Sequence, residues 1–261
     1  MIDKTAIIHP SAKIAENVLI GPYVIIGENV EIDEGTQIIA NCYLEHAKIG
    51  KRCIISPFST IGSAPQDLSY NGEKTSVIIG DDTIIKENVT IHRGSASGDF
   101  TTRIGNKCLL MVGSHVAHNC VLEDEVIMAN LATIGGHVHV GFGAFLGGMT
   151  VFHQNIRIGD MVIVSGFAAS RQDLLPYTKY DGRLAHPVGI NVVGLKRRGI
   201  EQTVRTEINS AYKLLVSDKY NTSQAIDKIK EEFPSGNEYI DKMIQFIKDS
   251  KRGVCLRTDR V

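Results

Sequence analysis

An apolar residue recurs at every sixth position over long stretches of this chain. The longest series holds eleven such residues in a row: Ile104, Leu110, Val116, Leu122, Met128, Ile134, Val140, Leu146, Phe152, Ile158 and Val164. In a chain that is 43% hydrophobic, a run of that length would arise by chance about once in ten thousand trials of one register. Shorter series precede it at Ile8, Ile14, Ile20, Ile26, Ile32, Ile38 and Leu44, at Ile49, Ile55 and Ile61, and at Ile79, Ile85 and Ile91. A fixed period of this kind is the signature of a repeat architecture.

Two further columns share the period. Four places after most of the apolar residues stands a small or β-branched residue, such as Val18, Cys53 or Ala132. The place directly after the apolar residue is often glycine, as at Gly105 and Gly135. We interpret each six-residue unit as one short strand plus a corner, with glycines and polar pairs turning the corners. Three units then make one coil of a triangular prism, and coils stack about 4.8 Å apart. The sequence therefore predicts an all-β solenoid, a parallel β-helix of hexapeptide repeats.

The repeat breaks at two places and then ends. Residues 63–78 and 95–103 exceed the six-residue count, so we expect two loops that leave the prism at a corner. Long loops on a regular scaffold tend to carry function. After Val164 the pattern decays, and Leu174-Leu175-Pro176 and His186-Pro187 indicate a linker. From about Gly194 the apolar spacing becomes helical, with further helices expected near 223–232 and 237–251, the last behind a capping box at Ser235-x-x-Glu238. We predict a β-helix over 1–190 and a C-terminal helical domain over 191–261.

Composition narrows the class of protein. The formal net charge of −1 argues against a general binder of nucleic acid or of membrane surfaces. The first residues show no signal peptide, and no stretch approaches the ~18 apolar residues that a membrane span needs. The five cysteines are odd in number and form no C-x-x-C pair, which favours free thiols in a reducing compartment. We therefore expect a soluble cytoplasmic protein without membrane insertion.

Three histidines lie where the repeat is longest. His118, His137 and His153 belong to units that begin 18 residues apart, at Val116, Ile134 and Phe152. Units one coil apart share a side of the prism, so we expect these imidazoles to form an outward column with steps of about 5 Å. Such a column suits acid–base catalysis near neutral pH. It equally suits a zinc site with three histidine ligands and one open position. The spacing alone leaves both chemistries open.

Several short segments resemble one family of hexapeptide-repeat acyltransferases, the UDP-N-acetylglucosamine O-acyltransferases of lipid A synthesis. The resemblance spans nearly the whole chain, including both loops and the helical end. Its motifs are Pro65-Gln66-Asp67-Leu68, Thr90-Ile91-His92-Arg93-Gly94, His115-Val116-Ala117-His118, Gly136-His137-Val138, Gly148-Met149-Thr150, His153-Gln154 and Gly194-Leu195-Lys196-Arg197-Arg198-Gly199. The resemblance implies left-handed coils and a homotrimer with active sites between subunits. Left-handed coils are an exception to the usual crossover rule.

The family moves a 3-hydroxyacyl group from acyl carrier protein to the 3-position of UDP-N-acetylglucosamine, the first step of lipid A biosynthesis. The donor is a phosphopantetheine thioester, and no further cofactor or metal is implied. By motif match, His118 is the general base and the backbone N–H of Gly136 faces the oxyanion. The match places the remaining site residues in three groups. His115, His137, His153 and Gln154 line the cleft, Gln66 and Asp67 bind the acceptor, and Asn191, Arg197 and Arg198 hold the nucleotide or the phosphopantetheine. Gly166 matches the position that limits acyl-chain length.

Three positions depart from the usual family pattern. Ser69 stands where a lysine is common, Asn119 where an aspartate usually follows the base, and Val193 where a glutamate is common. A neutral Asn119 can orient an imidazole but cannot offset the charge of an imidazolium. An amine acceptor would ask less of such a pair, so acylation of the 3-amino analogue of the sugar nucleotide is an alternative to acylation of the 3-hydroxyl. Two other classes stay open, namely a zinc enzyme like the γ-class carbonic anhydrases and a β-helix that binds sugar nucleotide without turnover.

Overall fold

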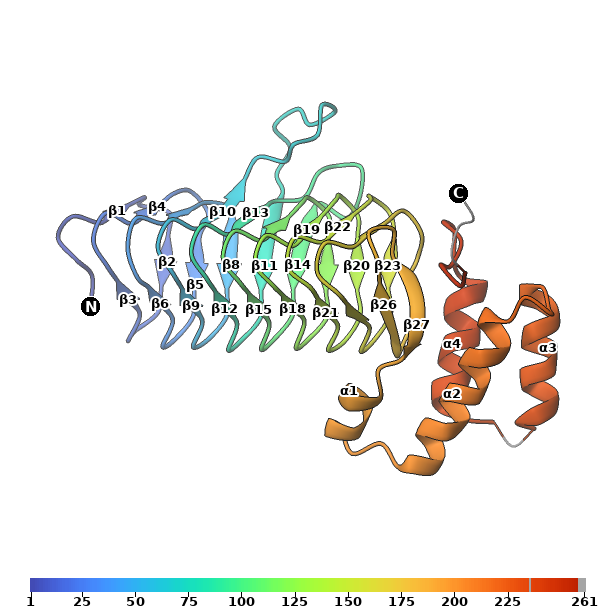
Figure 1. Cartoon of the computed structure of the whole chain (residues 1–261). Helices are drawn as coiled ribbons and strands as arrows, with labels where there is room; N and C mark the ends of the chain where they lie inside the picture. The colour runs from blue at the N-terminus through green and yellow to red at the C-terminus, as the bar shows by residue number, and fades with distance from the viewer. Residues whose placement is uncertain (235, 258–261) are drawn as a thin grey trace.

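The chain winds into a three-sided prism of short parallel strands that ends in a group of helices (Figure 1). The computed structural model describes residues 1–234 and 236–257. The first face is built from β1 (Ile7–Ile8), β4 (Ile25–Ile26), β7 (Tyr43–Leu44), β10 (Thr60–Ser63), β13 (Thr90–His92), β16 (His115–Val116), β19 (Thr133–Ile134), β22 (Val151–Phe152) and β25 (Ala169–Ser170). Each strand pairs in parallel with the strand one coil away, as at β16, where His115 is opposite Thr133. These pairings confirm the β-helix.

The other two faces follow the same rule. The second face holds β2 (Lys13–Ile14), β5 (Glu31–Ile32), β8 (Ala47–Ile49), β11 (Ser76–Ile79), β14 (Thr101–Ile104), β17 (Val121–Leu122), β20 (His139–Val140) and β23 (Arg157–Ile158). The third face holds β3 (Leu19–Ile20), β6 (Gln37–Ile38), β9 (Ile54–Ile55), β12 (Ile84–Ile85), β15 (Leu109–Leu110), β18 (Ile127–Met128), β21 (Phe145–Leu146) and β24 (Ile163–Val164), and it is extended by β26 (Thr178–Asp181) and β27 (His186–Ile190). Each coil contributes one strand to every face.

Both expected inward columns form the core of the prism. The apolar first place of the unit is buried from Ile20 onward, as at Ile91 and Val116, and so is the fifth place, as at Val126. The sulfur-bearing members of that fifth column, Cys42, Cys53, Cys108 and Cys120, are buried free thiols. Burial raises the pKa of Cys108 and of Cys120 to about 12, so these thiols stay protonated and inert.

The corners are turned by the fourth place of the unit, which is often a polar residue and in a few units a glycine, such as Gly113 at a φ of 68°. Residues there adopt a left-handed backbone in coil after coil, including Asn17 at a φ of 62° and Asn119 at 57°. The glycines at the second place have a different cause, because a side chain there would strike the next coil. A Cβ on Gly80 would lie 2.6 Å from Oδ1 of Asn106, and one on Gly50 2.5 Å from Oδ1 of Asp81. The expectation that polar residues and glycines turn the corners therefore holds at the fourth place, but it was wrong for second-place glycines such as Gly50 and Gly80.

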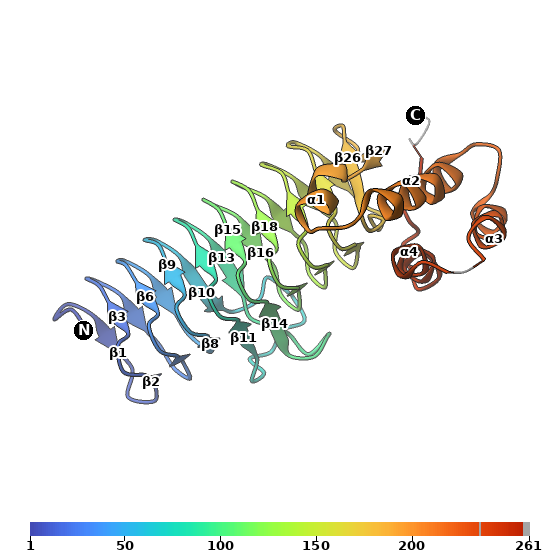
Figure 2. The ribbon, with the colours of Figure 1, turned by 90° about the horizontal axis from the view of Figure 1, so that it is seen from below.

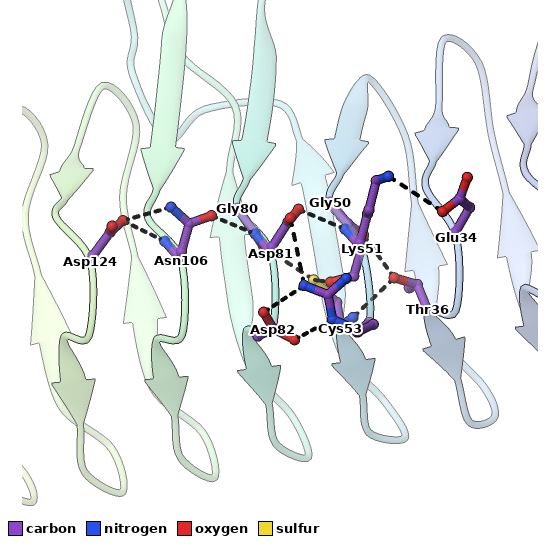
Figure 3. Close-up of polar contacts among 11 residues, drawn as sticks. Glu34, Thr36, Gly50, Lys51, Cys53, Gly80, Asp81, Asp82, Asn106 and Asp124 are labelled. Atoms are coloured by element: carbon purple, nitrogen blue, oxygen red, sulfur yellow. Dashed lines mark hydrogen bonds and ion pairs between the residues drawn. The ribbon is translucent and has the colours of Figure 1, made fainter.

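The polar residues at one corner form a ladder that explains this close approach (Figure 3). Asp81 accepts a hydrogen bond from the N–H of Lys51 at 2.9 Å, and Asn106 accepts one from the N–H of Asp81 at 2.8 Å. Asp124 continues the series by accepting from the N–H of Asn106 at 2.7 Å. These side chains pair backbone donors that the corner leaves unbonded in each coil.

Two loops leave the prism near its middle, one of them as a long projection in Figure 1. They comprise residues 64–75, between β10 and β11, and residues 93–100, between β13 and β14. Arg93 holds their bases together. Its Nη1 donates to Oε1 of Glu45 at 2.9 Å and to the carbonyl of Gly62 at 2.7 Å, and its Nε donates to the hydroxyl of Tyr70 at 3.1 Å. The loop bases are therefore fixed relative to the coil beneath them.

The segment after Val164 is not a linker. β26 and β27 form an antiparallel pair that adds to the third face, and Leu174 and Leu175 are fully buried. Tyr180 in β26 is also buried, and its hydroxyl donates to the carbonyl of Cys255 at 2.9 Å. Apolar residues that the six-residue period does not count thus close the end of the prism, which explains why the period failed there.

Four helices follow in the described chain: α1 (Val192–Arg197), α2 (Gln202–Val216), α3 (Thr222–Glu232) and α4 (Glu238–Lys248). α2, α3 and α4 gather beyond the last coils, away from the N-terminus, whereas α1 lies beside those coils (Figure 1 and Figure 2). The helices pack around a second apolar cluster that includes Ile208, Leu215 and Met243. Ser235, expected to cap α4, lies outside the described residues, and the N-cap is Asn237. No helix of residues 1–234 and 236–257 is long and apolar enough to span a membrane.

Candidate active site

His118 lies at the edge where the first face passes into the second, hereafter the His118 edge. It is the third residue of its six-residue unit and lies at the corner between β16 and β17, where side chains point outward. The next residue, Asn119, takes the left-handed corner conformation, which asparagine tolerates better than most residues. Asn119 is only 8% exposed, and its backbone N–H donates to Oγ1 of Thr102 at 2.9 Å. The His118 ring thus points outward from a corner whose backbone is held by hydrogen bonds.

Asn119 determines which ring nitrogen of His118 carries the proton. The Oδ1 of Asn119 accepts from the backbone N–H of Ser95 at 3.0 Å, and its Nδ2 donates to the carbonyl of Ser95 at 3.1 Å. These two contacts set the orientation of the amide, because a backbone N–H can only donate and a carbonyl only accept. The same Oδ1 lies 2.8 Å from Nδ1 of His118, so Nδ1 carries the proton in the neutral ring. Nε2 is then left with a lone pair that can accept a proton.

Gly136 lies in the next coil beside that lone pair. A Cβ at position 136 would come within 2.7 Å of both Nε2 and Cε1 of His118, which is closer than real Cβ contacts allow. Glycine therefore leaves the room that the imidazole occupies. The N–H of Gly136 donates to no acceptor within the described part of the chain. The lone pair of His118 and the unpaired N–H of Gly136 thus belong to neighbouring residues on this edge.

Two of the three expected column histidines meet on this edge. The rings of His118 and His137 lie 5.1 Å apart, edge to face. Burial lowers the pKa of His137, and the nearby His118 lowers it further. His153 lies on the same edge, but its Nδ1 is 3.1 Å from a guanidinium nitrogen of Arg252. The column is thus confirmed at the first step of about 5 Å, while the third ring has its own partner.

The three imidazoles do not converge on a shared point. Nδ1 of His118 is bonded to Asn119, Nε2 of His137 lies 3.1 Å from the hydroxyl of Ser97, and His153 faces Arg252. Among residues 1–234 and 236–257, no group of three or more His, Cys, Asp or Glu side chains could hold a metal ion. This arrangement does not support the zinc hypothesis, which needs three nitrogens on one ion.

Both loops reach the His118 edge. Asp67 of loop 64–75 accepts at Oδ1 from the N–H and hydroxyl of Ser69, at 2.9 and 2.7 Å. Its Oδ2 accepts from the hydroxyls of Ser95 and Ser97 of loop 93–100, at 3.0 and 3.3 Å. The hydrogen bonds from Ser69, followed by the one from Ser95, hold the pKa of Asp67 well below its usual range. The neighbouring Gln66 is exposed. The expected site residues Asp67 and His118 are thus brought together through serines that sequence reasoning missed.

A second histidine pair lies one coil earlier on the first face. Nδ1 of His115 lies 2.7 Å from Oγ1 of Thr90, and its ring meets His92 edge to face at 4.9 Å. His92 is 9% exposed, and its Nδ1 is buried without a hydrogen-bond partner among the described residues. Burial, reinforced by His115 and His118, lowers the pKa of His92 to about 4, so this ring stays neutral. His92 belonged to a quoted motif, but its spacing gave no reason to name it.

Gln154 follows His153 on the His118 edge, whereas the last four expected residues lie on other edges of the prism. Asn191 caps α1 where the second face passes into the third, hereafter the Arg198 edge, and its Nδ2 donates to the carbonyl of Met161 at 2.8 Å. Arg198 lies there too, donating to Glu125 at 2.6 Å and stacking on Phe142 at 4.5 Å, while Arg197 is exposed. Gly166 lies on the third corner, hereafter the Gly166 edge. One copy of the chain does not bring these residues to His118.

Comparisons with known proteins agree with this architecture. Residues 173–255 match a family model described as UDP-N-acetylglucosamine O-acyltransferase, domain 2, and residues 2–93 match one described as the GMPPB C-terminal domain. LpxA of Acinetobacter baumannii superposes with a TM-score of 0.94 at 37% identity, covering 97% of this chain and 98% of that one. The UDP-N-acetylglucosamine acyltransferase of Francisella novicida superposes with a TM-score of 0.95 at 33% identity, covering 100% and 95%.

A curated relative spans the same length. The acyl-(acyl-carrier-protein)–UDP-N-acetylglucosamine O-acyltransferase of Thermodesulfovibrio yellowstonii is 47% identical over 255 residues, which are 97% of this chain and 98% of that protein. A match of this length spans both loops and the helical end of the chain. The chain belongs to the UDP-N-acetylglucosamine O-acyltransferase family.

Proposed function

We propose that this protein transfers a 3-hydroxyacyl group from acyl carrier protein to the 3-hydroxyl of UDP-N-acetylglucosamine, the first step of lipid A biosynthesis. The observation that carries the proposal is the pair at the His118 edge. Nε2 of His118 holds a free lone pair because Oδ1 of Asn119 accepts the hydrogen bond from Nδ1 at 2.8 Å, and the N–H of the neighbouring Gly136 has no acceptor within the described chain. A base next to an oxyanion donor is what acyl transfer to a hydroxyl requires.

In this reaction His118 first accepts one proton and later donates it. Nε2 of His118 takes the proton of the sugar hydroxyl while the oxygen attacks the thioester carbonyl. The N–H of Gly136 donates to the negative oxygen of the tetrahedral intermediate. When that intermediate collapses, the carbon–sulfur bond breaks, and the imidazolium returns the proton to the leaving phosphopantetheine thiolate. Asn119 keeps the ring in the orientation and tautomer that both steps need.

The remaining sequence-based roles are part of the same proposal. Gln66 and Asp67 face the acceptor, and His115, His137, His153 and Gln154 line the cleft. Arg197 has an exposed guanidinium that suits a phosphate. Asn191 and Arg198 are held by Met161 and Glu125, so they would shape the same nucleotide or phosphopantetheine subsite from a fixed position. The division into a β-helix domain over 1–190 and a helical domain over 191–261 is also proposed, and it agrees with the end of β27 at Ile190.

A homotrimer with sites between subunits would complete this cleft. Exposed apolar side chains stand on the first face, the third face and the Gly166 edge between them: Ile7, Ile25, Val151, Leu19, Ile54, Ile84, Tyr23, Phe58, Leu131, Met149 and Phe167. The second face instead presents charged residues such as Lys13, Glu31 and Arg157. Packing the first face of one copy on the third face of another, around a three-fold axis, would cover the apolar surface. The His118 edge of one copy would then meet the Arg198 edge of its neighbour.

The direct test is product formation by the purified protein. Mass spectrometry would follow UDP-N-acetylglucosamine and its 3-amino analogue, each offered with 3-hydroxyacyl carrier proteins of several chain lengths. We expect the O-acylated sugar nucleotide, and we expect His118→Ala to lower turnover by about 10² to 10⁴. His139→Ala is the matched control, because His139 lies on the second face and pairs with Glu123 at 2.9 Å.

Three results would contradict the proposal. Tight binding of the sugar nucleotide without any product would favour the non-catalytic alternative. Loss of activity with a chelator and its return with zinc would favour metal chemistry. Exclusive acylation of the 3-amino analogue would favour N-acyl transfer.

A further inference from the structure

We propose that Ser95 and Ser97 are positioning residues that couple the negative charge of Asp67 to the catalytic imidazole of His118. The inference rests on the proposed function, in which His118 is the general base. It assigns a positioning role in catalysis to loop 93–100. It also gives Asp67 a second role, stabilising the charge on His118, in addition to facing the acceptor.

The need for such a coupling comes from Asn119. The imidazolium that forms on His118 during the reaction carries a positive charge, and the group bonded to its Nδ1 is a neutral amide at 2.8 Å. A neutral acceptor orients the ring but leaves the new charge without a counter-ion. Any offsetting charge must therefore come from elsewhere on the His118 edge.

Asp67 supplies a carboxylate that stays ionised. Its oxygens accept from the N–H and hydroxyl of Ser69 and from the hydroxyl of Ser95, and the hydroxyl of Ser97 lies 3.3 Å from Oδ2. The hydrogen bonds from Ser69, followed by the one from Ser95, hold the pKa of Asp67 well below its usual range, so the group stays negative at neutral pH. About four acceptor positions are available on a carboxylate, and serines of the chain itself occupy most of those of Asp67.

Ser95 stands between this carboxylate and the base. It is 1% exposed, and its Oγ lies 3.0 Å from Oδ2 of Asp67 and 3.5 Å from Nδ1 of His118. The same oxygen is 3.0 Å from Oδ1 of Asn119, but a hydroxyl has one proton, which favours the charged acceptor. With that proton directed at Asp67, a lone pair of Ser95 can face the ring. The serine thereby presents its negative end to the imidazole.

Ser97 extends the arrangement to His137. Its Oγ lies 2.6 Å from Oγ of Ser95, 3.3 Å from Oδ2 of Asp67 and 3.1 Å from Nε2 of His137. Because Ser97 has one proton and Ser95 gives its own to Asp67, the 2.6 Å contact makes Ser97 the donor to Ser95 and leaves Asp67 as its more distant neighbour. One direction then runs from the N–H of His137 to Ser97, from Ser97 to Ser95, and from Ser95 to the carboxylate. Chains of hydrogen bonds with one direction polarise each other and strengthen. Both imidazoles of the edge are thus linked to a single negative charge.

The other charged groups near His118 do not replace Asp67. His137 stands 5.1 Å away, and burial lowers its pKa and so favours the neutral ring, which cannot offset a positive charge on His118. His92, in the preceding coil, is neutral because burial lowers its pKa to about 4. Asp99 of the same loop faces His137, but it is paired with Arg103 at 3.3 Å. Asp67 is therefore the carboxylate whose charge acts on the base.

The test compares the pH dependence of kcat/KM in the wild type, Ser95→Ala, Ser97→Ala, Asp67→Asn and Ser69→Ala. Removing the negative charge, or the serine that carries its effect, makes the imidazolium of His118 easier to deprotonate. The acid limb of the profile, where kcat/KM falls because the base is protonated, should therefore move to lower pH. We expect a shift of about one pH unit in Asp67→Asn and about half a unit in Ser95→Ala, with a plateau about three- to tenfold lower. Ser97→Ala should show a smaller shift in the same direction. Ser69→Ala removes a hydroxyl from the far oxygen of Asp67, so its limb should stay in place.

Ser95→Ala is informative because it removes the hydroxyl and keeps the backbone contacts of residue 95. The contacts that orient Asn119 come from the backbone N–H and carbonyl of residue 95, which alanine retains. A merely structural role of Ser95 would lower the rate at every pH without moving the limb, and that result would overturn the proposal. A limb that moves equally in Ser69→Ala would overturn it as well.

A second measurement separates this inference from the proposed function. Diethyl pyrocarbonate reacts with neutral imidazole, and peptide mass spectrometry reports its attachment to His118 without any substrate. The pH at which His118 becomes reactive should fall in Ser95→Ala and Asp67→Asn, even if the wild type acylated no sugar nucleotide. Unchanged reactivity curves in both variants would refute the coupling, whatever the enzyme assay shows.

Discussion

The imidazole of His118 occupies the space that a side chain on Gly136 would need. An added Cβ would stand 2.7 Å from Nε2, the nitrogen that holds the free lone pair. The two residues come from neighbouring coils, and the N–H of His137 fastens those coils by donating to the carbonyl of His118 at 3.0 Å. The base can therefore move away from position 136 only by leaving the amide of Asn119.

Gly136→Ala should consequently act on catalysis more than on folding. The displaced ring would lose its alignment with Asn119, and the methyl group would cover the unpaired N–H. We expect kcat/KM to fall by about 10² or more, since a donor of this kind is worth that much, with a melting temperature within a few degrees of the wild type. Steady-state kinetics and thermal unfolding check both halves. Activity near that of the wild type would show that neither the ring position nor the N–H matters.

Leu131→Arg should dissociate the proposed trimer. Leu131 is 47% exposed at the corner between the third and first faces, and its side chain lies over Gly113, where a Cβ would meet Cδ2 at 2.7 Å. Three arginines brought together near a three-fold axis would repel each other and bury charge. Sedimentation velocity at micromolar concentration should show trimers for the wild type and monomers for the variant. Lys48→Glu on the charged second face is the matched control and should leave assembly intact.

The buried His92 predicts a loss of stability on acidification. Burial lowers the pKa of His92 to about 4, whereas an unfolded histidine titrates near 6.5. Between these values the unfolded state binds the proton and the folded state does not. The free energy of unfolding should therefore fall as the pH drops from about 6.5 to about 4, by at most about 1.4 kcal/mol per pH unit for this group.

The measurement compares melting curves of the wild type and His92→Phe across that range. Phenylalanine keeps a ring against His115 and removes both the titration and the unpartnered Nδ1. The variant should lose less stability on acidification than the wild type. Parallel pH dependences in the two proteins would show that His92 is not the group responsible.

The fold was predictable because its cause is local and periodic. Each coil repeats the same apolar first place and small fifth place, so Val116 and Cys120 are buried for the same reason as Ile134 and Val138 one coil later. The meeting of His118 and His137 followed from the same count. Within the regular coils, the six-residue period is enough to predict where each strand ends and each corner begins.

The contacts of the loops could not be predicted in this way. Ser95 and Ser97 lie where the period is broken, and their partners Asp67 and His118 are 28 and 23 residues distant in sequence from Ser95. The closing strands β26 and β27 were mistaken for a linker because their pairing is antiparallel and outside the repeat. Helix α4 begins at a cap formed by Asn237, a local signal that was available and was overlooked in favour of Ser235.

Gly166→Met should shorten the acyl chain that the enzyme prefers. A Cβ at this position would meet the carbonyl of Gly148 at 3.2 Å and otherwise little, so a side chain can be accommodated by small shifts. The family resemblance implies that Gly166 limits the length of the acyl chain, so the longer methionine side chain should take up room that the end of the chain would need. With carrier proteins loaded with chains of graded length, the optimum should move down by several carbons. An unchanged optimum with full activity would remove Gly166 from the proposed role.

Asn119→Asp tests whether the departure from the usual aspartate is adapted to its surroundings. Nδ2 of Asn119 donates to the carbonyl of Ser95 at 3.1 Å, so an aspartate would set a carboxylate oxygen against a carbonyl oxygen there. A buried contact of that kind costs about 1–3 kcal/mol, and it would push loop 93–100 away from Asp67. We expect a lower melting temperature and a kcat/KM for UDP-N-acetylglucosamine about tenfold below that of the wild type, despite the added negative charge. The same assay on the 3-amino sugar nucleotide provides the comparison, since an acceptor that needs less of the base should be less affected. A variant that is faster than the wild type on the hydroxyl sugar would show that the charge at position 119 outweighs the contact with Ser95.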